Sequence, residues 1–110
     1  MKQLFDTVSL KASKMVTNSY STSFSLGIKF LDKQFHYPIY SIYGFVRFAD
    51  EIVDSFHDYN KEELLAEFKV ETYKSIERGI SLNPILNSFQ KSLNQIQVDF
   101  IIIHYFLKAI

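Results

Sequence analysis

The sequence lacks cysteine, an excess of positive charge and long hydrophobic runs. Without cysteine, the 110-residue chain has no disulfide framework, thiolate metal site or catalytic thiol. Lys and Arg total 12, as do Asp and Glu, so no overall basic field draws the protein onto nucleic acid. The early acid Asp6 argues against a secretory signal, and no apolar run approaches the roughly 18 residues of a membrane span. We therefore expect a soluble, cytoplasmic protein, or one in peripheral contact with a membrane.

Turn-forming residues are also scarce. Only three glycines and two prolines interrupt the chain, and alternating β-branched stretches are few. The length is that of one domain, and the hydrophobic share of 47% is too high for an intrinsically disordered chain. The sequence therefore predicts a single all-α domain over residues 1–110.

Apolar periodicity predicts the helices. A first helix over about residues 2–16 would bury an apolar stripe, and a polar stretch at 17–23 would end it before a second helix starts near Phe24. Asp32 is a candidate cap in the next connection. The stripe of the first helix consists of Phe5, Val8, Ala12 and Met15. Further helices are predicted over 38–55, 61–78, 85–93 and 100–107, with capping signals at Asn60, Gly79 and Asn83.

The helix predicted over 38–55 is apolar around most of its circumference, which is typical of a buried helix. Its main stripe consists of Ile39, Ile42, Val46, Ala49, Val53 and Phe56, widened by Phe45, Phe48 and Ile52. Its polar residues Tyr43, Arg47, Asp50 and Asp54 recur at i, i+4, i+7 and i+11 and share one narrow face, with Glu51 beside them. Unpartnered buried charges are costly, so we expect this polar stripe to face a cavity, a counterion or a ligand.

The stripe suggests diphosphate and metal chemistry. Two carboxylates one helical turn apart suit Mg²⁺, which completes its coordination with water and phosphate oxygens. Arg47 could grip a diphosphate through its planar fork, or pair with Asp50. A simpler interpretation is a solvated surface with weak i,i+4 ion pairs. Likewise, the polar residues before Phe24 could cap a helix or hold an anion.

Two segments together resemble a known family. Tyr20-Ser21-Thr22-Ser23-Phe24, followed by residues 42–54 (IYGFVRFADEIVD), is similar to the N-terminal signature of squalene/phytoene synthases. The resemblance covers essentially the whole chain and includes the turn at 83–86. It implies an isoprenoid-synthase-type helical bundle and a Mg²⁺-dependent prenyltransferase, with Mn²⁺ as an alternative ion, that joins two identical prenyl diphosphates head to head.

The resemblance also implies roles for individual residues. Asp50 and Asp54 would bind metal bridging to the substrate diphosphate, with Glu51 as a supporting acid. The residues implied to contact substrate or diphosphate are Tyr20, Ser21, Thr22, Ser23, Phe24, Tyr43 and Arg47. Phe24, Tyr43 and Phe45 are candidates to stabilise a carbocation, or simply core residues. The sequence departs from the family at Thr22, His36 and Tyr37, where relatives often carry basic residues.

The family's second aspartate-rich motif does not occur in these residues. We therefore expect the chain to be the N-terminal part of a longer enzyme and to be inactive alone. In the full-length enzyme, the favoured reaction is condensation of two geranylgeranyl diphosphates to phytoene. The alternatives are squalene or dehydrosqualene synthesis from farnesyl diphosphate, and a non-catalytic helical module that self-associates through an exposed apolar face.

Overall fold

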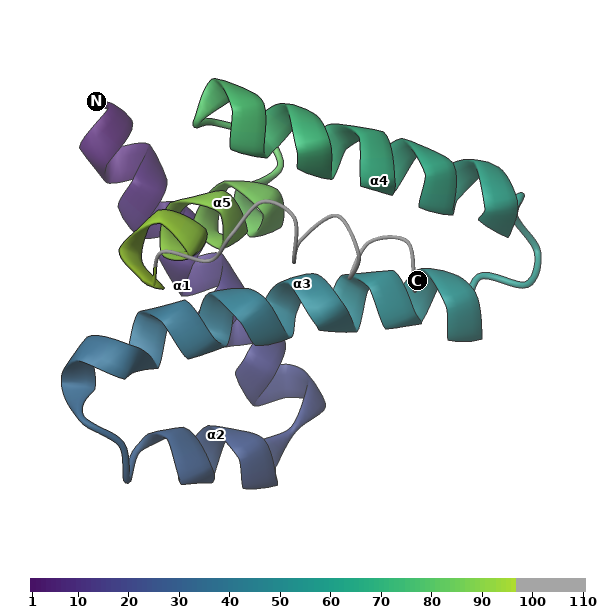
Figure 1. Cartoon of the computed structure of the whole chain (residues 1–110). Helices are drawn as coiled ribbons and strands as arrows, with labels where there is room; N and C mark the ends of the chain where they lie inside the picture. Colours follow the sequence, from purple (N-terminus) through teal and green to yellow (C-terminus); the bar gives the residue numbers. More distant parts are fainter. Residues whose placement is uncertain (97–110) are drawn as a thin grey trace.

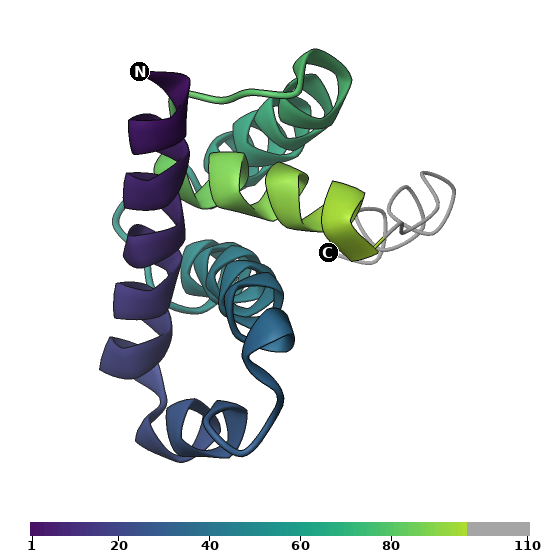
Figure 2. The ribbon, with the colours of Figure 1, turned by 90° about the vertical axis from the view of Figure 1, so that its left-hand side faces the viewer.

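The computed structural model describes residues 1–96, so the predicted helix at 100–107 lies outside the described residues. Three helices, α1 (Lys2–Tyr20), α3 (His36–Asp54) and α5 (Pro84–Ile96), pack against one another, as Figures 1 and 2 show. Helix α4 (Lys61–Arg78) lies on one side of α3, and α2 (Thr22–Ile28) lies on the other. A short 3₁₀ helix, η1 (Lys33–Phe35), leads into α3. Residues 1–96 contain no strand, and the all-α prediction is confirmed.

Local capping explains why α4 has the predicted bounds. The Asn60 Oδ1 accepts a hydrogen bond from the Glu63 backbone N–H at 3.1 Å, which satisfies one of the free N–H groups of the first turn. At the other end Gly79 is left-handed, with φ at 72°, a conformation that glycine adopts without steric cost. Asn83 similarly accepts a hydrogen bond from the Ile85 backbone N–H at 3.0 Å at the start of α5.

The first helical boundary differs from the prediction. Helix α1 continues through the polar residues 17–20, and the break is the single extended residue Ser21 (φ −147°, ψ 98°). The Ser21 Oγ accepts a hydrogen bond from the Phe24 N–H at 3.1 Å and caps α2, which begins at Thr22. Asp32 precedes η1, but its side chain makes no capping hydrogen bond.

An aromatic stack joins α3, α4 and α5. The Phe45 ring is 3.9 Å from the Phe89 ring and 5.2 Å from the Phe68 ring, measured between centroids. Ala49 and Ile52 of α3 are buried beside this stack. The core face of α3 is therefore rotated from the predicted stripe, whose last members Val53 and Phe56 are exposed.

Helix α1 corrects a second prediction, because its buried face is mainly polar. Val8 and Met15 of the predicted stripe are exposed, at 49% and 65%. The buried face consists of Asp6, Ser9, Ser13, Val16 and Thr17. It meets polar residues of α5, since the Asn87 Nδ2 donates to Asp6 Oδ1 at 2.9 Å and to Ser9 Oγ at 3.1 Å. Apolar periodicity could not reveal a helix face that is satisfied by hydrogen bonds.

Candidate active site

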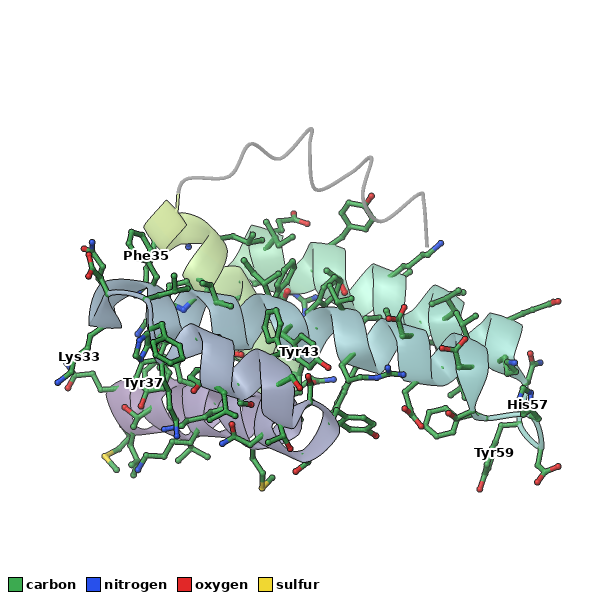
Figure 3. All side chains as sticks on the ribbon, turned by 90° about the horizontal axis from the view of Figure 1, so that it is seen from below. Lys33, Phe35, Tyr37, Tyr43, His57 and Tyr59 are labelled. Carbon is green, nitrogen blue, oxygen red and sulfur yellow. The ribbon has the colours of Figure 1, made fainter. Side chains whose placement is uncertain are left out.

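The fold brings the two signature segments into contact. Because the chain turns at Ser21, α2 runs back beside α3, and the Phe24 ring stacks on the Tyr43 ring. Their centroids are 4.7 Å apart and their planes are inclined by 25°. Tyr43 is half-buried and lies where α2 passes over α3 in Figure 3. Residues separated by a long connection thus form one aromatic wall.

Arg47 lies one turn further along α3. Its guanidinium carbon is 5.0 Å from the centre of the Tyr20 ring, and its Nη2 donates to Glu51 Oε2 at 3.2 Å. The side chains of Arg47 and Glu51 are each 23% exposed. The Nε of Arg47 is buried and, within residues 1–96, donates no hydrogen bond. Because a guanidinium has five N–H donors, Arg47 retains capacity for an anion.

Asp50 and Asp54 are exposed, and neither carboxylate has an ion pair or side-chain hydrogen bond in the part of the chain that the structure describes. The expectation that the polar stripe faces a cavity therefore fails at its acidic end. The physical reason is rotation: the stripe lies on the opposite side of α3 from Phe45, Ala49 and Ile52, which face the core. Burial thus gives no support for a metal site at these carboxylates.

The acidic end of α3 carries little compensating charge within residues 1–96. Asp50, Glu51 and Asp54 lie in the last turns of α3, whose final turn has no basic residue. The free carbonyl groups at a helix C-terminus carry partial negative charge, so carboxylates there raise the energy of the folded state. Arg47 offsets only Glu51. A cation near Asp50 and Asp54 would relieve this repulsion.

The donor set determines which ion fits. Among residues 1–96, no cluster of three or more metal-ligating side chains is present, which excludes a closed protein cage there. Mg²⁺ needs only one or two carboxylates when water and phosphate oxygens supply the other ligands. Asp50 and Asp54 fit this pattern. The Glu51 carboxylate is less available to a metal because it forms an ion pair with Arg47.

The remaining residues singled out from the sequence lie at the surface, at a helix cap or in the core. Thr22 and Ser23 are exposed, whereas Ser21 caps α2. Phe45 belongs to the core stack and not to the wall formed by Phe24 and Tyr43. The His36 Nε2 contacts the Leu31 carbonyl oxygen at 2.8 Å, and this contact ties the start of α3 to the connection that follows α2.

A cavity between α3 and α4 was missed by sequence reasoning. It has a volume of about 370 Å³ and an apolar lining that includes Phe48, Ile52 and Leu64. Acidic side chains also line it, among them Glu51, the partner of Arg47. Asp50 and Asp54 do not line this cavity. Its formation depends on how α4 packs across α3, which no short sequence pattern specifies.

Comparison with known proteins assigns the family. Residues 17–110 match the family model described as squalene/phytoene synthase. The chain belongs to the squalene/phytoene synthase family. No curated protein and no solved structure matches it significantly. The match contains both the Tyr20–Phe24 segment, which contacts Tyr43 and Arg47, and the Asp50–Asp54 motif further along α3.

Family membership agrees with the architecture. The packed helices of residues 1–96 fit part of an isoprenoid-synthase-type helical fold. Squalene/phytoene synthases are prenyltransferases, so the family indicates transferase chemistry on prenyl diphosphates. Within residues 1–96, no helix is both long and apolar enough to cross a membrane.

Proposed function

We propose that this family member contributes the first acidic motif of a Mg²⁺-dependent, head-to-head prenyltransferase. The proposed reaction is condensation of two geranylgeranyl diphosphates to phytoene. The observation that carries the proposal is the contact between the two signature segments: Tyr20 and Phe24 pack on Arg47 and Tyr43, with Asp50 and Asp54 further along the same helix. General family resemblance favours geranylgeranyl over farnesyl diphosphate.

Arg47 is the residue proposed to hold the diphosphate. Tyr20 and Glu51 fix the plane of its guanidinium, and the N–H groups that do not bond Glu51 are proposed to donate to phosphate oxygens. Ionisation of an allylic diphosphate breaks its C–O bond and leaves both electrons on the departing diphosphate. Hydrogen bonds from Arg47 would stabilise this negative charge as it develops.

Asp50 and Asp54 are the proposed metal ligands, with Glu51 in support. When bound, Mg²⁺ supplies electrostatic stabilisation of the leaving diphosphate. The contribution of the chain is to keep two carboxylates one turn apart at the end of α3, free of internal partners. No side chain among residues 1–96 competes with a cation for these two carboxylates.

The aromatic wall is proposed to face the hydrocarbon part of the substrate. Phe24 and Tyr43 stack face to face, and both remain partly exposed. Aromatic rings stabilise a carbocation without attacking it, because their π faces are electron-rich but weakly nucleophilic. Thr22 and Ser23 are exposed near the start of α2 and are proposed to contact the substrate.

We expect the 110-residue chain not to turn over by itself. After Asp54 the sequence offers no second carboxylate pair within an apolar helix, so only one of two diphosphates would have an acidic motif. Incubation with radiolabelled geranylgeranyl diphosphate and Mg²⁺, followed by solvent extraction, tests this. Detection of phytoene from the isolated chain would contradict it.

The metal site can be tested even if binding is weak. Mn²⁺ with inorganic pyrophosphate should broaden the amide NMR signals of Asp50, Asp54 and Arg47 more than those of α4, because a paramagnetic ion acts on nearby nuclei. The double variant Asp50→Asn/Asp54→Asn should lose this broadening. It should also melt at the same or a higher temperature without metal, since each removed charge relieves about 0.3–1 kcal/mol of repulsion at the helix end.

Asp58→Asn is the matched control, since Asp58 is exposed just beyond α3 and outside the stripe. Its spectrum should broaden like that of the unsubstituted chain. Broadening centred on the acidic first turn of α4 at Glu62 and Glu63, or unchanged in the double variant, would rule out the proposed metal ligands.

A further inference from the structure

The connection between α2 and α3 exposes apolar and basic side chains together. Phe30 is 90% exposed and Leu26 is 52% exposed. Lys29 and Lys33 are exposed beside them in the sequence. We name residues 26–37 the connection surface; its exposed apolar members are Leu26, Phe30, Leu31, Phe35 and Tyr37. A single exposed apolar side chain is ordinary, but five of them within twelve residues are typical of an interaction surface.

Charge is distributed unevenly along a chain whose total is zero. Residues 1–49 contain six Lys and Arg against two Asp, whereas residues 50–96 contain five against nine Asp and Glu. Helix α3 runs from one region to the other. Figure 3 shows Lys33, Phe35 and Tyr37 at one end of the molecule, and His57 and Tyr59 at the opposite end. The connection surface therefore lies at the end opposite His57 and Tyr59, and its two lysines outnumber its one carboxylate, Asp32.

We propose that the connection surface binds an anionic lipid bilayer. Phe30 and Leu26 would insert among the acyl chains near the headgroups, while Lys29 and Lys33 would pair with anionic headgroups. Asp32 is the one acidic residue between positions 26 and 37, so the field at this surface remains basic. This binding is independent of the catalytic function proposed above.

The charge pattern favours lipid over a second copy of the chain. A symmetric dimer through this surface would bring two like-charged patches together, and each copy offers only Asp32 to pair with the two lysines of the other. An anionic bilayer complements these lysines across its whole plane. It also suits scattered apolar side chains, because lipid adapts to their shape whereas a protein partner needs a matching pocket.

The orientation would separate the membrane from the acidic motif. The connection surface ends in the first turn of α3, which begins at His36, and Asp50 lies fourteen positions after His36. At 1.5 Å per residue, about 20 Å of helix separates them. Asp50, Glu51 and Asp54 would thus be kept away from anionic headgroups, which they would otherwise repel.

Vesicle flotation tests the proposal. Purified chain should float with phosphatidylcholine vesicles that contain about a quarter phosphatidylserine, and rising salt should weaken this binding. Phe30→Ser should lower the partition coefficient about tenfold. Lys29→Gln and Lys33→Gln should each lower it about fivefold on the anionic vesicles and leave binding to pure phosphatidylcholine unchanged.

Matched variants distinguish binding through this surface from nonspecific adsorption to the vesicles. Leu82→Ser removes a side chain that is also 90% exposed but lies between α4 and α5, and it should float like the unsubstituted chain. Lys74→Gln removes a lysine of α4 and should likewise have no effect. Circular dichroism should give the same helix content for every variant, since all these side chains are at least partly exposed.

Three outcomes would overturn the proposal. The first is absence of binding to the anionic vesicles, and the second is an equal loss in Leu82→Ser. The third is a lipid-free dimer in sedimentation that Phe30→Ser dissociates, which would assign the surface to a second copy. The variants Asp50→Asn and Asp54→Asn should float normally, so failure of the metal site and failure of the membrane surface are distinguishable.

Discussion

At the scale of single residues, Arg47 shows how one side chain is prepared for an anion. Its guanidinium lies over the Tyr20 ring in a cation–π contact, and its Nη2 forms an ion pair with Glu51. Lysine has the same charge but no planar fork, so it can reproduce neither the stacking nor the parallel hydrogen bonds. The geometry of Arg47 therefore matters as well as its charge.

Arg47→Lys should weaken pyrophosphate binding about tenfold while changing unfolding free energy by less than about 1 kcal/mol. Titration followed by NMR measures the affinity, and urea denaturation measures the stability. Arg78→Lys, at an exposed position in the last turn of α4, provides the control and should bind normally. Equal affinity for Arg47→Lys and the unsubstituted chain would argue against direct diphosphate contact.

Asp6 links stability to pH. Hydrogen bonds from Asn87 and Lys2, opposed by burial and aided by Lys91, lower the pKa of Asp6 from 3.8 to about 2. Because the folded-state pKa is below the unfolded value, this stabilisation is complete above pH 4 or so and is lost as pH falls toward about 2. The ion pairs of Asp6 therefore contribute at neutral pH but not in strong acid.

Asp6→Asn should lower the unfolding free energy at neutral pH by about 1–3 kcal/mol, because Lys2 and Lys91 lose a buried acceptor. The variant should also lose less stability than the unsubstituted chain between pH 4 and about 2. Urea denaturation at each pH measures both effects. Asp32→Asn changes an exposed carboxylate that makes no capping bond; a loss as large as that of Asp6→Asn would contradict this explanation.

Sequence reasoning predicted which residues of the two motifs lie close together better than it predicted their surroundings. Tyr20, Phe24, Tyr43 and Arg47 were predicted from their motif, and they do lie together. Their pairing follows from α2 folding back at Ser21. The exposure of Asp50 depends on the rotation of α3, which many side chains set jointly and no single spacing determines.

At the scale of elements, α1, α3 and α5 approach closely through small residues. A Cβ on Gly44 would lie 3.3 Å from the Ser13 Oγ and 3.4 Å from the Ser13 Cα. Ser13 in turn shares a hydrogen bond with Ser88 of α5. Ser13 is fully buried between these helices, so it has little room to move away.

Gly44→Ala should lower the unfolding free energy by about 1–2 kcal/mol, since crowding against Ser13 outweighs the better helix propensity of alanine. Gly27→Ala is the matched change in α2, where no atom lies within 4 Å of the added Cβ. It should stabilise the protein by about 0.5–1 kcal/mol. Thermal denaturation of both variants measures the contrast; stabilisation by Gly44→Ala would show that the helices can separate freely.

Helices with strong terminal signals were predicted best. Helix α4 has an asparagine cap and a left-handed glycine, and both of its bounds were predicted from sequence. The N-terminal boundary of α2 was displaced because serine and threonine can cap a helix or continue one. In α1 they continue it, with Thr17 Oγ1 donating to the Ser13 carbonyl at 2.9 Å.

At the scale of the whole molecule, the aromatic stack makes α3, α4 and α5 depend on one another. Phe45 contacts Phe68 of α4 and Phe89 of α5, so unfolding of either helix would expose the centre of the core. We therefore expect the described helices to unfold in one cooperative transition.

Phe45→Ala should lower the unfolding free energy by about 3–5 kcal/mol, through lost burial and the cavity that remains. Leu82→Ala, at an exposed position between α4 and α5, should change it by no more than about 0.5 kcal/mol. Urea denaturation followed by circular dichroism measures both values. Separate melting of α4 in the Phe45 variant would show that this helix is held by other contacts.

The polar contact between the first and last described helices has a consequence for how they align. The Asn87 Nδ2 donates to Asp6 and Ser9, while the Oδ1 of the same side chain accepts from the Ser81 backbone N–H at 3.2 Å. If α5 slid along α1 by one turn, these donors and acceptors would lose their partners in a place that water cannot easily reach. An apolar interface would tolerate such sliding far better, because apolar contacts are not directional. The hydrogen bonds therefore specify one alignment of α1 and α5.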